Sequence, residues 1–317
     1  MTDEAMVPDE GRMERGWRRA AGLFLIAVAT SVAPPGLLVA VPLLVLLSVR
    51  GIRSGAAFAV TVVAMLVVLT GPRDGLWFAE RGWAMLAGGA FAALSLAVPG
   101  WRLTSRSLVA VTGAMVVCVV VLASRADAWA SIDWGMGDRL RAGFATWLDA
   151  MQVLRGGDPV PAATVTAAFA TAEALVAVFP AVVALQSMAT LAVAWWVYVR
   201  LAYRRDDAVG ALGAFRFNDH LVWLMIVGLC LVVLRTGDGV TRIGANLAVF
   251  MGALYTVRGL GVASFVSGGV SFLGGSLMVL AFLFAAPVVV GFTLLLGIAD
   301  TWLDVRTAWD RWLPEKS

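Results

Sequence analysis

Polar side chains inside otherwise apolar stretches are the residues of this sequence that could do chemistry. Arg258 lies near the end of an apolar run, and Tyr255 precedes it by three residues on nearly the same helical face. An arginine in this setting must be paired, hydrated or able to reach lipid headgroups. Two interpretations stay open. Arg258 is a cationic contact for a ligand that approaches closely at Gly259 and Gly261, or it marks a span end and snorkels to headgroups.

Asn246 and Glu173 are two further polar residues in apolar surroundings. Asn246 follows Arg242 by one helical turn, and it could bind a ligand or hydrogen-bond to a neighbouring helix. Glu173 would carry a proton if it were buried, whereas on a surface helix it is simply solvated. The candidate ligand-binding residues are therefore Arg258, Tyr255, Asn246 and Glu173.

Residue types that build catalytic or metal centres are scarce, since the chain has one histidine and two cysteines. Asn218, Asp219 and His220 form a polar triplet that is interpreted as helix capping, because no second histidine or cysteine completes a metal site. Asp300 and Asp304 lie one turn apart and could share a cation, but solvation is the preferred interpretation. No phosphate loop or dinucleotide fingerprint occurs. The sequence predicts no catalytic residue, no metal, no cofactor and no enzymatic activity.

The composition is that of an integral membrane protein. Of 317 residues, 61% are hydrophobic and only 14% are charged, and the mean hydropathy is +0.88. Soluble domains are about half apolar and about a quarter charged. The 24 basic and 21 acidic residues are spread over short loops, which indicates orientation signals and argues against nucleic acid as a partner. Cys118 and Cys230 lie in apolar stretches and are interpreted as small buried hydrophobes.

Apolar runs divided by proline, glycine and arginine predict an all-α polytopic transmembrane bundle of about nine spans, with eight or ten as alternatives. The first apolar region is too long for one span and is divided at Pro34 and Pro35. Pro180 divides a docked helix or half-span at 162–179 from the sixth span. The predicted spans are 17–33, 36–49, 56–70, 77 or 83 to 98, 108–123, 181–201, 221–234, 245–265 and 272–298.

Two amphipathic segments complete the organisation. The insert at 125–161 carries a helix on the membrane surface or capping the bundle, and the tail at 299–317 is an interfacial anchor. Apolar residues recur every three or four positions in the insert at Leu140, Phe144, Trp147, Met151 and Leu154, and in the tail at Trp302, Val305, Trp309 and Trp312. The transmembrane domain is 17–298, and 1–16 is a flexible segment. Arginines before the first span predict a cytoplasmic N-terminus.

Three segments carry a resemblance to a known family. They are residues 42–57 (PLLVLLSVRGIRSGAA), the pair Phe179 and Pro180, and residues 246–261 (NLAVFMGALYTVRGLG). These segments resemble those of the YybS-like family of uncharacterised bacterial polytopic membrane proteins. The resemblance covers nearly the whole length of the chain. The resemblance implies a multi-pass protein in the lipid bilayer of the bacterial inner membrane, and it assigns no activity.

The front half is also similar to the substrate-binding subunits of energy-coupling-factor transporters and to the rod-shape component MreD. All share a short span, a glycine turn and a span of small residues. The first similarity implies a substrate-binding or transport-related membrane subunit with no ATPase activity of its own, with membrane partner subunits and a small-molecule ligand. The second implies the alternative, a non-transporting scaffold for envelope or division proteins.

Overall fold

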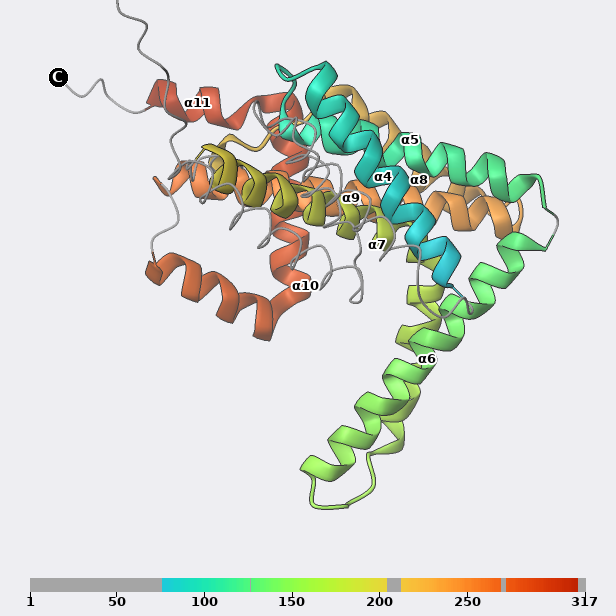
Figure 1. Cartoon of the computed structure of the whole chain (residues 1–317). Coiled ribbons are helices and arrows are strands. Elements are labelled where there is room, and N and C mark those ends of the chain that lie inside the picture. Colours follow the sequence, from blue (N-terminus) through green and yellow to red (C-terminus); the bar gives the residue numbers. More distant parts are fainter. Residues whose placement is uncertain (1–75, 126, 204–211, 269–271, 313–317) are drawn as a thin grey trace, which may run out of the picture. The chain divides into compact units, whose positions relative to one another are not determined.

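The computed structural model describes residues 76–125, 127–203, 212–268 and 272–312, and all regular secondary structure in these ranges is helical. The first three predicted spans, the segment 1–16 and the motif at 42–57 lie outside the described residues. Figure 1 shows the helices in chain order. They are α4 (Trp77–Ala97), α5 (Leu103–Ala123), α6 (Ala128–Leu154), α7 (Ala162–Tyr203), α8 (Val222–Leu234), α9 (Asp238–Val266), α10 (Phe272–Leu303) and α11 (Val305–Trp312).

The described helices confirm an all-α membrane protein. Four segments of the described ranges are long and apolar enough to cross a bilayer, namely Leu103–Ala123, Ala162–Trp196, Asp238–Val266 and Phe284–Leu303. A shorter apolar helix covers Asp219–Leu234, where the turn η3 (Asp219–Leu221) leads into α8. The total of about nine spans stays a prediction. The chain divides into two compact units, 1–128 with 186–209 and 129–185 with 210–317.

Two helices begin earlier than their apolar runs. The predicted spans start at 108 and 245, but α5 begins at Leu103 and α9 at Asp238. Apolarity reports which part of a helix is buried, whereas the backbone hydrogen bonds extend into the polar flanks. Arg106 and Arg242 therefore lie on helices and not in loops. The predicted span at 221–234 agrees with α8, which ends where Arg235 adopts a left-handed conformation with φ 45°.

The helices that contain Pro180 and Pro287 differ from the prediction. The division at Pro180 is wrong, because α7 continues through this residue as one helix of 42 residues. The unbroken span at 272–298 is also wrong. Ala285, two residues before Pro287, has φ −137° and ψ 34°, so α10 bends there and then continues to Leu303. Proline removes one N–H donor and disfavours helical geometry in the residue before it.

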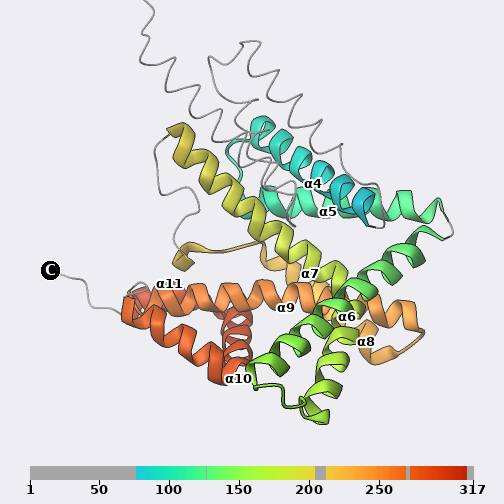
Figure 2. The same cartoon turned by 60° about the horizontal axis from the view of Figure 1, so that its bottom comes forward.

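The predicted amphipathic insert forms a helix, α6, within the range 125–161. Figure 1 and Figure 2 both show α6 running beside the N-terminal part of α7. Arg141 of α6 donates from Nε to Oε1 of Glu173 on α7 over 2.9 Å. The Glu173 side chain is 59% exposed, so the interpretation of Glu173 as a buried carboxylate is wrong.

In the second unit, α9 packs against both α8 and α10 at glycines. A Cβ built at Gly259 would lie 1.8 Å from the carbonyl oxygen of Thr293 on α10. A Cβ at Gly244 would lie 2.7 Å from the carbonyl oxygen of Gly228 on α8. Small residues let helix backbones approach this closely in membranes, where van der Waals packing drives association. The glycine-containing faces of α9 therefore pack against α8 and α10 within the protein.

We expect Gly259→Ala to lower the melting temperature of the detergent-solubilised protein, because the added methyl group overlaps the Thr293 carbonyl. Overpacking of this kind costs about 1–3 kcal/mol. Gly252→Ala is the matched control on the same helix, since no described heavy atom lies within 4 Å of its Cβ position. The control gains up to about 1 kcal/mol of helix propensity. Equal melting temperatures for the two variants would contradict the close approach.

Candidate functional site

Two polar clusters lie in the second unit, and each is built around an arginine of α9. The kink cluster surrounds Pro180, and the Arg258 cluster lies toward the other end of α9. The kink cluster comprises Asp133 of α6, Phe179 and Pro180 of α7, and Arg242 and Asn246 of α9. The Arg258 cluster comprises Asp219 of η3, Arg258 of α9, Asp300 of α10 and Arg306 of α11.

Asn246 replaces backbone hydrogen bonds that the proline disrupts in α7. Pro180 has no N–H to donate to the carbonyl of Val176, and its ring pushes the helix turns apart. The amide nitrogen of Ala181 donates to Oδ1 of Asn246 over 2.9 Å. Nδ2 of Asn246 donates in turn to the carbonyl oxygen of Ala177 over 3.0 Å. The side-chain amide of Asn246 thus bonds to one donor and one acceptor of the α7 backbone.

Arg242 supplies the remaining donors at the kink. Its Nη2 donates to the carbonyl oxygen of Val176 over 2.9 Å, and its Nε donates to that of Ala177 over 3.1 Å. Asp133 of α6 forms an ion pair with the same guanidinium group. The positive charge brought to the backbone of α7 is therefore balanced by a carboxylate from a third helix.

Two aromatic rings cover this guanidinium group. Trp129 and Phe179 stack with their centroids 5.7 Å apart and an interplanar angle of 19°. The guanidinium carbon of Arg242 lies 5.5 Å from the Trp129 ring and 5.7 Å from the Phe179 ring. Cation–π attraction favours the charged form of arginine at this range. The rings, the carboxylate and the backbone carbonyls together hold Arg242 in one place.

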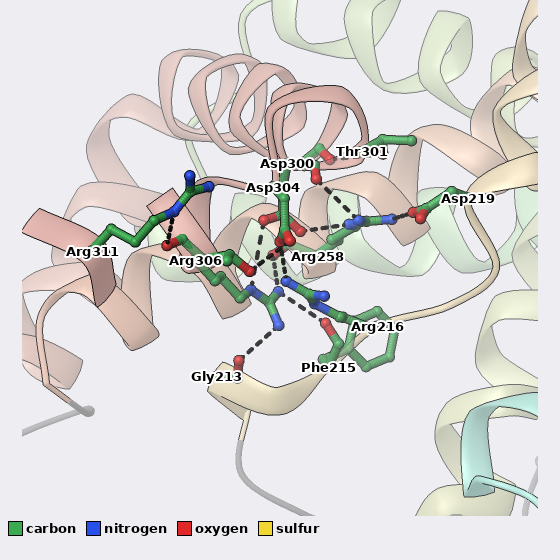
Figure 3. Close-up of polar contacts among 12 residues, drawn as sticks. Gly213, Phe215, Arg216, Asp219, Arg258, Asp300, Thr301, Asp304, Arg306 and Arg311 are labelled. Carbon is green, nitrogen blue, oxygen red and sulfur yellow. Dashed lines mark hydrogen bonds and ion pairs between the residues drawn. The ribbon is translucent and has the colours of Figure 1, made fainter. Parts of the chain in front are cut away.

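The Arg258 cluster is centred on a buried ion pair. Arg258 is 2% exposed and Asp300 is 0% exposed. Nε of Arg258 donates to Oδ2 of Asp300 over 2.9 Å, and Nη1 donates to Oδ1 of Asp219 over 2.6 Å. Figure 3 shows the Arg258 side chain between the two carboxylates. Snorkelling of Arg258 and solvation of Asp300 were both wrong expectations, because each charge finds its partner inside the protein.

Arg306 connects the C-terminal tail to the same cluster. Its Nη1 donates to the carbonyl oxygen of Gly213 over 2.8 Å, and its Nη2 donates to that of Phe215 over 2.9 Å. Its Nε lies 3.8 Å from Oδ1 of Asp300. Residues 299–303 complete α10, and α11 forms a separate helix in the described part of the tail. The tail is thus fastened by a buried arginine as well as being amphipathic.

Asp304 makes the turn between α10 and α11. Its φ of 42° is left-handed, a conformation that aspartate tolerates better than most residues. The Thr307 hydroxyl donates to Oδ2 over 2.6 Å, and Nη2 of Arg216 donates to Oδ1 over 2.5 Å. These two donors, Thr307 first, hold the pKa of Asp304 below its ordinary value. The turn is therefore most stable above the carboxyl pKa of the unfolded chain and weakens as the pH falls through the lowered pKa.

The structure does not bring the four sequence-predicted residues into one site. Asn246 lies in the kink cluster and Glu173 on the exposed face of α7, whereas Tyr255 and Arg258 lie together on α9. The Tyr255 ring meets Phe217 edge to face at 5.1 Å, and the Arg258 guanidinium lies 5.4 Å from the same ring. Asn246 bonds across helices, as its packing interpretation expected. Within the described ranges, no group of three histidine, cysteine or acidic residues is placed to hold a metal.

Sequence reasoning missed Asp133 and Arg306. Asp133 appeared to be one of many charges in a solvated insert, and Arg306 lay in a tail with an ordinary amphipathic pattern. A signal existed for the kink cluster, because Pro180 inside an apolar helix leaves carbonyls that need donors from elsewhere. Arg242 was an available donor, but the sequence does not say which helices face each other.

Asn246→Leu is expected to lower the free energy of unfolding by about 1–3 kcal/mol, because the backbone N–H of Ala181, a buried residue, loses its acceptor and the carbonyl of Ala177 keeps only Arg242 as a side-chain donor. Pro180→Ala restores the backbone donor, so the double variant should lose clearly less than the sum of the single effects. Denaturant titration of all four proteins in detergent micelles measures this coupling. Additive effects would show that Asn246 does not serve the kink.

Arg258→Met should be strongly destabilising, by about 3–5 kcal/mol, because it leaves Asp300 buried without its main countercharge. Arg216→Gln is the matched control. It removes an exposed ion pair to Asp304, which contributes about 0–1 kcal/mol. Arg258→Met combined with Asp300→Leu should recover part of the loss. Thermal unfolding in detergent is the measurement, and a loss for Arg258→Met no larger than for Arg216→Gln would contradict the ion-pair assignment.

Comparison with known proteins agrees with the membrane character of these helices. No curated protein and no solved structure matches the chain. One family model matches residues 20–301, which include both clusters apart from Arg306. The chain therefore belongs to the family described as "Predicted membrane protein (DUF2232)".

Proposed function

We propose that this protein is a transport-related membrane subunit that acts without catalysis and without an ATPase activity of its own. The observation that carries the proposal is the kink cluster. α7 is a continuous apolar helix that contains Pro180, and its backbone groups beside this proline are bound by Arg242 and Asn246 of another helix. This part of α7 is the element that would move when a ligand or a partner subunit binds.

Three physical arguments support this assignment. Backbone groups in a bilayer must find partners within the protein, so a bent helix is tolerated only where other groups satisfy it. Ionisable residues on membrane helices are costly and are a reason to suspect function. Transporters commonly place their sites at discontinuous helices, where polar backbone faces a cavity. α7 is continuous, but Arg242 and Asp133 likewise bring charged groups to backbone atoms of an apolar helix beside Pro180.

The finer assignments are part of the same proposal. We place the chain among the YybS-like proteins of the bacterial inner membrane, with its N-terminus in the cytoplasm. The resemblance of residues 42–57 and 246–261 supports the first assignment, and the arginines around the first spans support the second. A small-molecule ligand and membrane partner subunits are the expected partners.

A scaffold for envelope or division proteins is the second candidate. It is favoured by the use of Arg258 and Asn246 inside the protein, where neither side chain is free to contact a ligand directly. It is also favoured by α6, on which Trp134 is 71% exposed. The exposed large apolar residues of α6 are Trp129, Trp134, Trp147, Val153 and Leu154. A protein partner could cover them.

Affinity purification from native membranes, with mass spectrometry of proteins and small molecules, tests the two functions. A transport-related subunit should be recovered with a membrane coupling subunit and ATPases, or with a bound small molecule. Pro180→Ala should insert normally but reduce that recovery several-fold, because it restores the backbone donor that Pro180 lacks and weakens the need of α7 for Arg242 and Asn246. Pro287→Ala, a second in-helix proline outside the cluster, is the control. Recovery of envelope-assembly proteins without a small molecule would replace the transport proposal with the scaffold.

A further inference from the structure

The first unit contains a buried arginine with two nitrogen atoms that have no hydrogen-bond partner among the described residues. We propose that the start of α5 binds a phosphate group, carried by an anionic lipid headgroup or by a small phosphorylated solute. The donors are Arg106 and Ser107 of α5 and Ser95 of α4. This site lies apart from the kink cluster in the chain and does not depend on the proposed transport function.

Arg106 is the central observation. It is 4% exposed, and among the described residues its Nε and Nη1 atoms have no hydrogen-bond partner. Buried donors without partners are rare, and an unpaired buried charge is costlier still. Arg258 and Arg306 of the second unit, which are equally buried, each bond to carboxylate or carbonyl oxygens. The partner that we propose for these two donors is an anion that binds from outside the chain.

Aromatic packing fixes the position of this guanidinium group. Its carbon lies 4.3 Å from the ring centroid of Trp195 on α7. Trp195 is held in turn by Phe91 of α4, edge to face at 6.3 Å. An aromatic face attracts the cation but accepts no hydrogen bond at Nε or Nη1. Nε and Nη1 therefore stay available as charged donors to phosphate oxygens.

Two buried serines lie near the connection between α4 and α5. Ser95 is one turn after Phe91 on the same face of α4, and Ser107 is next to Arg106 on α5. Both serines are buried, and neither hydroxyl has a hydrogen-bond partner among the described residues. The two helices pack against each other and are joined through 98–102, so residues near each side of this connection are neighbours. The hydroxyls add neutral donors beside the unpaired arginine.

The N-terminus of α5 favours the same ligand. Arg102 precedes the helix in an extended conformation, and its side chain forms no capping hydrogen bond. The first N–H groups of a helix lack intrahelical partners and carry partial positive charge, which attracts phosphate. No acidic residue lies in the first turn of α5. Trp101 and Arg102 are exposed beside the site, as expected at headgroup depth.

The test uses the full chain, purified and delipidated in detergent, with three probes: phosphatidylglycerol, phosphatidylcholine and inorganic phosphate. Thermal stabilisation and native mass spectrometry report binding. Wild type should prefer phosphatidylglycerol to phosphatidylcholine, and Arg106→Met should lower the affinity by about tenfold or more. Without a probe, Arg106→Met should be at least as stable as wild type, because it removes an unpaired buried charge. Arg125→Gln, an exposed arginine at the far end of α5, should bind as wild type does.

The outcomes separate the sources of the phosphate. Binding of phosphatidylglycerol alone indicates a lipid headgroup, and stabilisation by inorganic phosphate as well indicates a solute site. Equal binding of all probes by wild type and Arg106→Met, or no binding by wild type, overturns the proposal. If Arg106→Met does not fold, the Ser95→Ala and Ser107→Ala variants keep the test open. Each should weaken binding by about 2–10-fold without changing the ligand-free melting temperature, and unchanged binding in both overturns the proposal.

Discussion

Backbone groups of a membrane helix must be satisfied within the protein, and the second unit is organised around the place where this is hardest. Pro180 breaks the hydrogen-bond ladder of α7, and Arg242 and Asn246 of α9 complete it. Arg242 needs a countercharge, which brings Asp133 of α6 to the same point. Side chains of α6 and α9 thus meet α7 at Pro180, because the backbone groups beside this proline need hydrogen-bond partners.

Helix α9 is the central element of this unit because it combines close backbone packing with fixed charges. Gly244 and Gly259 let it touch α8 and α10 without intervening side chains. Arg258 then joins α10 and η3 through Asp300 and Asp219. Buried ion pairs add little net stability to a fold, but they penalise any arrangement in which the partners separate. The glycines allow the contact, and the charges select its register.

The three buried arginines among the described residues show how a fold decides what a charged residue does. Arg258 and Arg306 bond to oxygen atoms of the chain, and Nε of Arg306, which makes no hydrogen bond, still lies 3.8 Å from Oδ1 of Asp300, so both are interpreted as structural. Arg106 lies against an aromatic ring, and its Nε and Nη1 have no hydrogen-bond partner in the described part of the chain. Burial alone therefore does not identify a binding residue. A binding residue is identified by the balance between hydrogen-bond donors and acceptors around the charge, because an excess of donors requires an acceptor from another molecule.

The sequence alone determined the membrane environment, the all-helical class, the bounds of α8 and the amphipathic α6, because each depends on local composition and period. It also identified Asn246 and Arg258 as unusual. Only the tertiary structure decided their roles, since Asn246 meets Ala181 across 65 residues and Arg258 meets Asp300 across 42. It likewise decided that α7 continues through Pro180. A hydrogen-bond partner that distant leaves no local pattern, so the pairing becomes visible only when the helices are packed.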